Sequence, residues 1–151
     1  MTIRVSTALL KKIMDGGAGG GIKGGLSPCF CAIYQGTQPA SANTGVTGIL
    51  LGIISINGLG VTGLTWDAAT GGVIPKAAAE AWKVTYTQAG VAGFFRFYLA
   101  GDTITTTDAT KSRLDGSCGT SGADMNMSNL TAVVDRVDSV DSFTVTLPSG
   151  E

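Results

Sequence analysis

A run of glycines near the start of the chain constrains its fold most strongly. From Gly16 to Gly25 the sequence reads GGAGGGIKGG, in which seven of the ten residues are glycine. Glycine-rich segments behave as flexible chains, so we interpret residues 16–27 as a tether. The tether divides a short N-terminal arm, residues 1–15, from a body rich in Ser, Thr and Gly, residues 28–151.

The arm has the pattern of a short amphipathic helix. Ser6 or Thr7 can cap its start, and Gly16 can end it. A helix of about nine residues is marginal alone in water, so it must dock either on its own body or on another subunit. The sequence leaves both alternatives open. The apolar residues recur at i, i+3 and i+4 on one face, and we take them as candidate interface residues: Leu9, Leu10, Ile13 and Met14.

The body is predicted to consist of short strands separated by turns of Gly, Asn, Asp and Ser. About eight or nine such strands predict an all-β fold, an antiparallel β-sandwich or jelly roll that carries the short N-terminal helical arm. The segment Thr47–Ile56 is apolar on both faces, which favours a central position between two layers. The predicted strands are Cys29–Gln35, Thr47–Ile56, Val61–Trp66, Trp82–Thr87, Phe94–Leu99, Thr103–Thr107, Ala123–Met127 and Ser142–Leu147.

Three further segments have less regular patterns. Asn57-Gly58 is the strongest short hairpin signal in the chain and predicts a tight turn. Val73–Ala81 combines helix formers with strand-rich neighbours, and the neighbours favour a strand or loop. Residues 134–142 repeat Val-Asp steps every three residues, which predicts a twisted or bulged edge segment.

The composition argues against several classes of function. The chain has no histidine, which excludes Ser–His–Asp and Cys–His catalysis, and we expect no enzyme. Cys29, Cys31 and Cys118 supply too few well-spaced ligands for zinc, so we expect buried, reduced thiols and neither metal nor cofactor. The net charge of -1 gives no electrostatic case for nucleic acid. The apolar stretch Gly48–Ile56 is far shorter than the ~20 residues that span a membrane, so no membrane is expected.

Two polar positions have competing interpretations. Asp115 is the first residue to test as part of an aspartate pair in a hydrolase, but a turn aspartate that bonds its own backbone is favoured. Arg96 lies between Phe94 and Tyr98 on one strand face, where its guanidinium can lie over a ring. Aromatic residues with Arg are enriched at interface hot spots, and the same set also fits the edge of a core. Phe94, Arg96 and Tyr98 therefore join the candidate interface residues.

Four stretches in series carry a resemblance to a known family. They are AIYQGTQPASANTGVTGILLGI at 32–53, AGFFRFY at 92–98, RLDGSCGTSGADMNM at 113–127 and DSFTVTLP at 141–148. Their order and spacing resemble small structural proteins of tailed-bacteriophage virions. The head pattern IRVST-LL before a glycine-rich join is similar to that family too. The resemblance covers most of the body, and the family supplies no catalytic residues to transfer.

The resemblance implies a non-enzymatic component of the virion. The expected function is capsid decoration, as a cement protein that binds the major capsid protein on the head surface as a homo-oligomer. Assembly would take place in the cytoplasm of the bacterial host. Only 14% of the residues are charged, which suits a surface packed against neighbours. The alternative is a tail, baseplate or fibre component that binds host glycan through exposed Trp66 and Trp82.

Overall fold

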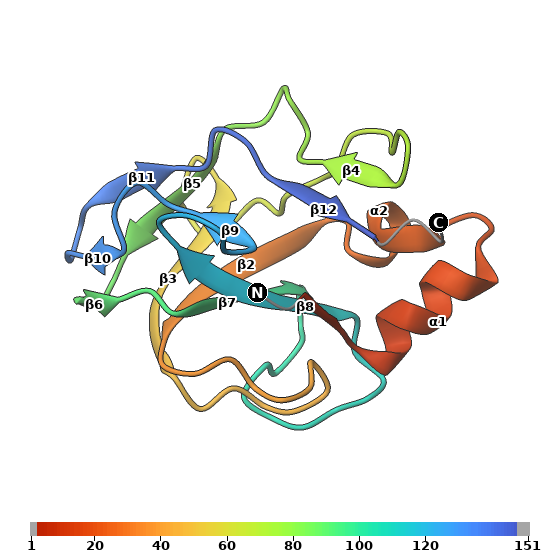
Figure 1. Cartoon of the computed structure of the whole chain (residues 1–151), viewed down its shortest axis with the longest axis horizontal. Coiled ribbons are helices and arrows are strands. Elements are labelled where there is room, and N and C mark those ends of the chain that lie inside the picture. Colours follow the sequence, from red (N-terminus) through yellow and green to blue (C-terminus); the bar gives the residue numbers. More distant parts are fainter. Residues whose placement is uncertain (1–2, 148–151) are drawn as a thin grey trace.

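The computed structural model describes residues 3–147 and shows a β protein with two short helices in that range (Figure 1). Residues 1–2 and 148–151, including Pro148 at the end of the stretch DSFTVTLP, lie outside the described range. The elements are β1 (Arg4–Val5), α1 (Thr7–Asp15), α2 (Gly21–Gly25), β2 (Cys29–Gln35), β3 (Ile49–Ile56), β4 (Val73–Pro75), β5 (Trp82–Tyr86), β6 (Gly90–Val91), β7 (Phe94–Leu99), β8 (Arg113–Gly119), β9 (Met125–Asn126), β10 (Thr131–Ala132), β11 (Val137–Ser139) and β12 (Thr144–Thr146).

One large sheet organises the chain. Its strand order is β1-β8-β7-β2-β3-β5-β11, and β9 adds to β8 as the eighth strand. The β8–β9 pair is parallel, and the other pairs along the sheet are antiparallel. Two antiparallel ribbons, β6–β10 and β4–β12, complete the strands of the described residues.

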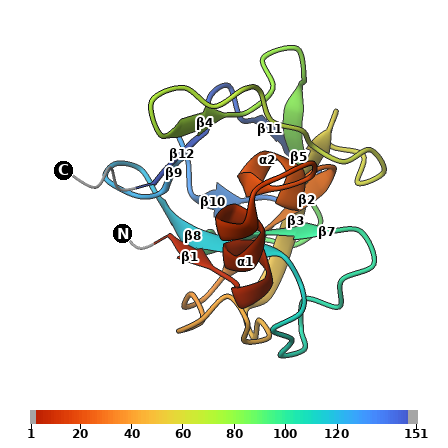
Figure 2. The ribbon, with the colours of Figure 1, turned by 90° about the vertical axis from the view of Figure 1, so that its right-hand side faces the viewer.

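The inner face of the large sheet carries the main core. Trp66 and Trp82 meet edge to face with ring centroids 5.3 Å apart, and Phe143 lies 5.4 Å from Phe97. Phe143 immediately precedes β12 and belongs to this core. The β4–β12 ribbon therefore covers the core on the side opposite β2 and β3, as Figure 2 shows. The register places one core residue from each of six adjacent strands in a row: Val5, Leu114, Phe97, Cys31, Ile54 and Val84.

The predicted all-β, antiparallel fold with a short N-terminal helix is confirmed. A sandwich requires two extended sheets packed face to face. Within residues 3–147 the strands form one extended sheet and two ribbons of two strands each. The finer prediction of a sandwich or jelly roll is therefore not confirmed, and the outer face of the large sheet has loops over part of it instead of a second sheet.

The N-terminal arm docks on its own body. Ser6 caps α1 by accepting a hydrogen bond from the Leu9 amide at 3.2 Å, and the Arg113 amide donates to the same hydroxyl at 2.9 Å. Leu9 is fully buried, and β1 pairs with β8. The sequence left open whether the arm docks on its own body or on another subunit, and in the structure it docks on its own body.

The glycine-rich segment is more structured than a tether. Residues 21–25 form α2, which packs beside α1 (Figure 2). Ile22 and Leu26 belong to the main core, and the Leu26 carbonyl accepts a hydrogen bond from Trp66 Nε1 at 2.8 Å. A Cβ at Gly25 would lie 2.6 Å from Leu9 Cδ1, so this glycine allows the helices to approach closely.

Several local predictions change in the structure. Asn57 and Gly58 do form a turn, with φ of 61° and 74°, and the Ile56 amide donates to the Thr62 carbonyl at 3.0 Å. The predicted strand Val61–Trp66 is reduced to isolated bridges at Leu64 and Trp66, and β3 forms its ladders with β2 and β5. Thr103–Thr107 forms turns instead of a strand. The segment Val73–Ala81, for which a strand or loop was favoured, begins with strand β4. Residues 134–142, with the repeated Val-Asp steps, contain the edge strand β11. Asp135, two residues before β11, has a positive φ of 67°.

Candidate interaction surface

A single row of residues crosses the whole outer face of the large sheet. Directly opposed residues in antiparallel strands share a face, so the register defines this row. The β1, β8 and β7 end of the row carries charged side chains, whereas the β3, β5 and β11 end does not. From one edge to the other the row is Arg4, Asp115, Arg96, Ala32, Ile53, Thr85 and Val137.

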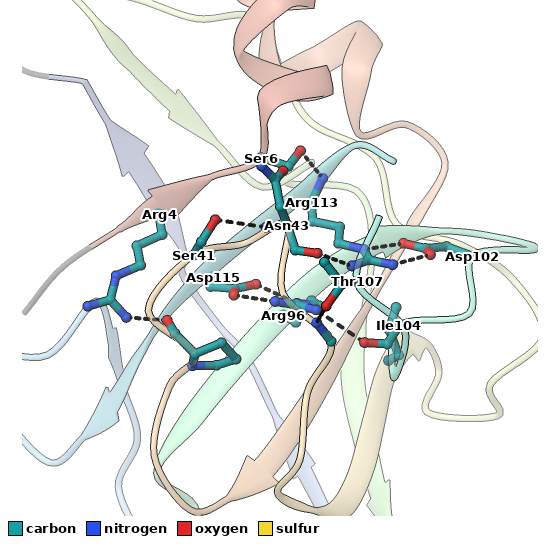
Figure 3. A network of polar contacts seen from close by, with 12 residues as sticks. Arg4, Ser6, Ser41, Asn43, Arg96, Asp102, Ile104, Thr107, Arg113 and Asp115 are labelled. Carbon is teal, nitrogen blue, oxygen red and sulfur yellow. Dashed lines mark hydrogen bonds and ion pairs between the residues drawn. The ribbon is translucent and has the colours of Figure 1, made fainter. Parts of the chain in front are cut away.

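The charged end of the row is buried under loops. Arg96 and Asp115 form a two-pronged ion pair with contacts of 2.7 and 2.6 Å, and neither side chain is exposed (Figure 3). Arg96 also donates to the Ile104 carbonyl at 3.2 Å, and Arg4 donates to the Pro39 carbonyl. These contacts join the sheet to the two loops that follow β2 and β7.

A second buried ion pair fastens the same loops. Arg113 binds both carboxylate oxygens of Asp102 at 2.7 Å (Figure 3). Its remaining donors reach the carbonyls of Asn43 at 3.2 Å, Thr106 at 3.0 Å and Thr103 at 3.3 Å. No buried side-chain nitrogen or oxygen within residues 3–147 lacks a hydrogen-bond partner. The network is therefore saturated and offers no free buried polar group to a ligand.

The structure corrects both interpretations of Asp115 and the prediction for Arg96. Asp115 lies in the middle of β8, so the turn interpretation is wrong. Burial raises the pKa of its carboxyl, and hydrogen bonds from Arg96 oppose that shift. The Arg96 guanidinium pairs with this carboxylate instead of lying over a ring. A carboxylate held in this way has no exposed surface with which to reach a substrate.

The candidate interface residues divide into buried and accessible groups. Leu9, Phe94 and Arg96 have no exposed surface, so they cannot contact a partner in this conformation. Tyr98 is half-buried beside the cluster of Tyr34 and Phe94. Of the remaining three on α1, Leu10 and Met14 are 48% and 77% exposed, and Ile13 is half-buried against the main core. We call this set the α1 ridge: Leu10, Ile13 and Met14.

The apolar end of the row is open to solvent. The 57–60 turn stands beside it, held by a hydrogen bond of 2.9 Å from Thr85 Oγ1 to the Gly58 carbonyl. Between the turn and the sheet lies a groove of about 430 Å³. Its side-chain lining is Leu50, Ile53, Leu59, Thr85 and Thr87. We call the exposed and half-exposed apolar side chains here the outer-face patch: Leu50, Ile53, Leu59, Val61 and Val137.

Sequence reasoning missed this patch although it had the signal for it. The segment Thr47–Ile56 is apolar on both faces, which predicted burial between two layers. In the structure Leu51 and Ile54 enter the core, whereas Leu50 and Ile53 lie on the outer face and are half-buried. The second apolar face of β3 is thus partly bare in the single chain.

The tryptophans are unavailable for glycan binding. Trp66 and Trp82 are buried in the main core. The Trp82 indole nitrogen donates to Glu80 Oε2 at 2.8 Å, so its polar atom is also occupied. The expectation that these two rings are exposed is wrong.

The cysteines are free thiols, with Cys29 and Cys31 buried and Cys118 half-buried. Burial raises the pKa of Cys118 from 9.0 to about 12, so its nucleophilic thiolate is scarce near neutral pH. In residues 3–147 no three side chains of His, Cys, Asp or Glu cluster as metal ligands would. Neither helix in this range has the length and apolar composition needed to cross a membrane.

Comparisons with known proteins do not extend this description. Protein-family models, curated proteins and solved structures all give no match to the chain. The resemblance to tailed-phage proteins therefore rests on the four sequence stretches and the head pattern. The geometry itself defines a β protein with a saturated buried polar network and two accessible apolar surfaces, the α1 ridge and the outer-face patch.

Proposed function

We propose that this chain is a non-enzymatic structural protein of a tailed-phage virion, a capsid decoration protein that binds the head surface and stabilises it. The observation that carries the proposal is the pair of apolar surfaces on different elements. Figure 1 shows α1 and β11, which belong to these two surfaces, at opposite ends of the molecule. A protein with two such surfaces can hold two neighbours together, as cementing a shell requires.

Burial of these surfaces provides the energy for cementing. Each Å² of apolar surface removed from water contributes about 25 cal/mol. A modest contact repeated at many sites on a shell becomes strong through multivalency. The low charged fraction of 14% reduces the cost of removing charges from water at such contacts.

We assign the head contact to the α1 ridge. The buried Leu9 and the hydrogen bonds of Ser6 hold the helix on the body, so the ridge is presented by a fixed element. A preorganised surface loses less conformational entropy on binding than a mobile arm. Next to the ridge, Lys11 and Asp15 form an exposed ion pair that neutralises both charges.

The test is co-sedimentation with purified heads that lack this protein, taken from the phage whose genome encodes the chain. The wild-type chain is expected to bind saturably, and Met14→Asp to bind at least about tenfold more weakly, because it places a charge in the apolar contact. Val133→Asp is the matched control, since Val133 is also exposed but lies outside both surfaces. Absence of wild-type binding, or equal binding by Met14→Asp, contradicts the proposal.

A further inference from the structure

The N-terminal arm is held on the body by contacts of several kinds. β1 pairs with β8, Leu9 enters the main core, and α1 packs beside α2. The Thr7 amide donates to Asn43 Oδ1 at 2.9 Å, and Asn43 Nδ2 donates to Thr7 Oγ1 at 2.8 Å. Residues 16–20, which link the arm to the body, take no part in these contacts. The arm is therefore a unit whose docking does not depend on the path of the link.

The link reverses the chain direction between α1 and α2 at one end of the molecule (Figure 1). Gly16, Gly17 and Gly19 have positive φ values of 62°, 77° and 79°. A Cβ at any of these three would meet no atom within 4 Å, so the reversal stands clear of the body. Within it, the Gly20 amide donates to the Gly17 carbonyl at 3.0 Å. Opening the reversal breaks this turn and disturbs little else.

The closed reversal depends on the glycines that form it. A Cβ at Gly20 would lie 2.4 Å from the Gly16 carbonyl oxygen, although the φ of -80° at Gly20 suits any residue. The close approach of the two backbone segments, and not the conformation of Gly20 itself, therefore requires glycine here. Glycine also loses more conformational entropy on ordering than any other residue. The closed reversal carries this entropic cost, which an open link avoids in part.

An open link has the reach to carry the arm away from its own body. Its five residues span about 17 Å when they are extended. The nine residues of α1 are about 14 Å long. The extended link is therefore longer than the helix that it carries, so α1 can leave its place beside α2 and dock on a neighbouring chain.

We infer that residues 16–20 are a hinge through which two copies of this chain exchange their N-terminal arms. In the exchanged dimer, β1 and α1 of each copy occupy the place beside β8 and α2 of the other. The docking contacts are those of the monomer, so the dimer requires no additional apolar surface. A short flexible linker gives docking within one chain an effective concentration of about 1 mM. Exchange therefore competes with docking in the same chain when the copies are that concentrated.

The experiment is sedimentation equilibrium of the full chain after refolding. The wild-type chain is expected to be a monomer when refolded at about 10 µM and to include dimer when refolded at about 1 mM. Gly20→Ala blocks the closed reversal but not the extended hinge, so it is expected to double the mass at about 10 µM. Gly101→Ala is the matched control, because Gly101 has a positive φ of 81° in a turn outside the hinge, and it is expected to stay monomeric.

A second variant tests the hinge without adding a Cβ. Removal of residues 17–20 leaves one residue between α1 and α2, fewer than the two that the shortest helical hairpins use. This shortened chain is also expected to be a dimer. Circular dichroism checks that both variants fold.

Cross-linking distinguishes exchange from any other dimer. Thr7→Cys and Asn43→Cys are added to Gly20→Ala and treated with a short bifunctional thiol reagent, since these two residues are in contact where the arm docks. The native thiols are buried or half-buried and react slowly. In an exchanged dimer the reagent joins two chains, which a denaturing gel shows as twice the mass, whereas an arm docked on its own body gives a link within one chain.

A wild-type chain that stays monomeric after refolding at about 1 mM overturns the inference, and so does a Gly20→Ala dimer linked only within each chain. The inference does not rest on the proposed function, because its partner is a second copy and its test requires no phage particle. An exchanged dimer that fails to bind heads contradicts the proposed function alone. A chain that binds heads but never exchanges its arm contradicts the exchange alone.

Discussion

At the scale of residues, the buried charges of the outer face hold the two loops onto the sheet. Removing charges from water is costly, and here the two-pronged contacts of Arg96 with Asp115 and of Arg113 with Asp102 offset that cost. Carbonyl groups from the loops accept the remaining guanidinium hydrogens. The loop backbone is thereby fixed by side chains that start on the strands.

Removing one partner of the Arg96–Asp115 pair should be more harmful than removing both. Arg96→Met leaves the Asp115 carboxylate buried without its main partner and is expected to lower the free energy of unfolding by about 3–5 kcal/mol. The double variant Arg96→Met/Asp115→Leu is expected to lose less. Urea unfolding measures both. As a control, Lys11→Met removes the exposed Lys11–Asp15 pair and should cost at most about 1 kcal/mol. A double variant less stable than Arg96→Met contradicts this account.

The buried thiols predict that the protein loses stability in alkaline solution. In the folded chain burial raises the pKa of Cys118 to about 12 and that of Cys31 well above 9.0. As pH rises through about 9, thiols of the unfolded chain lose protons while those of the folded chain keep them, so the unfolded state gains stability. The free energy of unfolding should be level from pH 7 to 8 and fall above pH 9, by up to about 1.4 kcal/mol per pH unit and thiol. Urea unfolding across this range measures it, and unchanged stability at pH 10 would refute it.

At the scale of elements, strands with aromatic and aliphatic patterns could be predicted, whereas β8 could not. The observed β2 and β7 have the predicted bounds, because nearly all of their residues are apolar or aromatic. The sequence of β8, RLDGSCG, lacks that pattern. Its charges are tolerated because Arg96 and Asp102, from distant segments, pair with them. Such long-range pairing leaves no local signal.

The docking site of α1 could not be predicted from the sequence either, because an amphipathic pattern shows which face of a helix is buried but not which surface buries it. The structure predicts that Leu9→Ala lowers the free energy of unfolding by about 2–5 kcal/mol, since it creates a cavity in the core. Leu10→Ala, on the accessible ridge, should change it by less than about 0.5 kcal/mol. Urea unfolding of the two variants decides between a docked and a free arm. Equal, small effects of both substitutions would show that the arm is free.

At the scale of the whole molecule, the candidate site was predictable only in part. Leu10, Ile13 and Met14 were identified from helical periodicity; Leu10 and Met14 are exposed, and Ile13 is half-buried against the main core. The outer-face patch was missed, because apolar residues on both faces of a strand usually indicate burial within one chain. Whether a second face is covered by the same chain or by another is a property of the full fold. The part of the outer face that the chain itself leaves uncovered is therefore one of the two features on which the proposed assembly rests.

The most direct test of the central claim is to locate the chain on intact virions with a gold-labelled antibody and electron microscopy. If the chain is a capsid decoration protein of a tailed phage, the label is distributed over the surface of the heads. Label confined to tails or baseplates, or its absence from virions, would contradict the account.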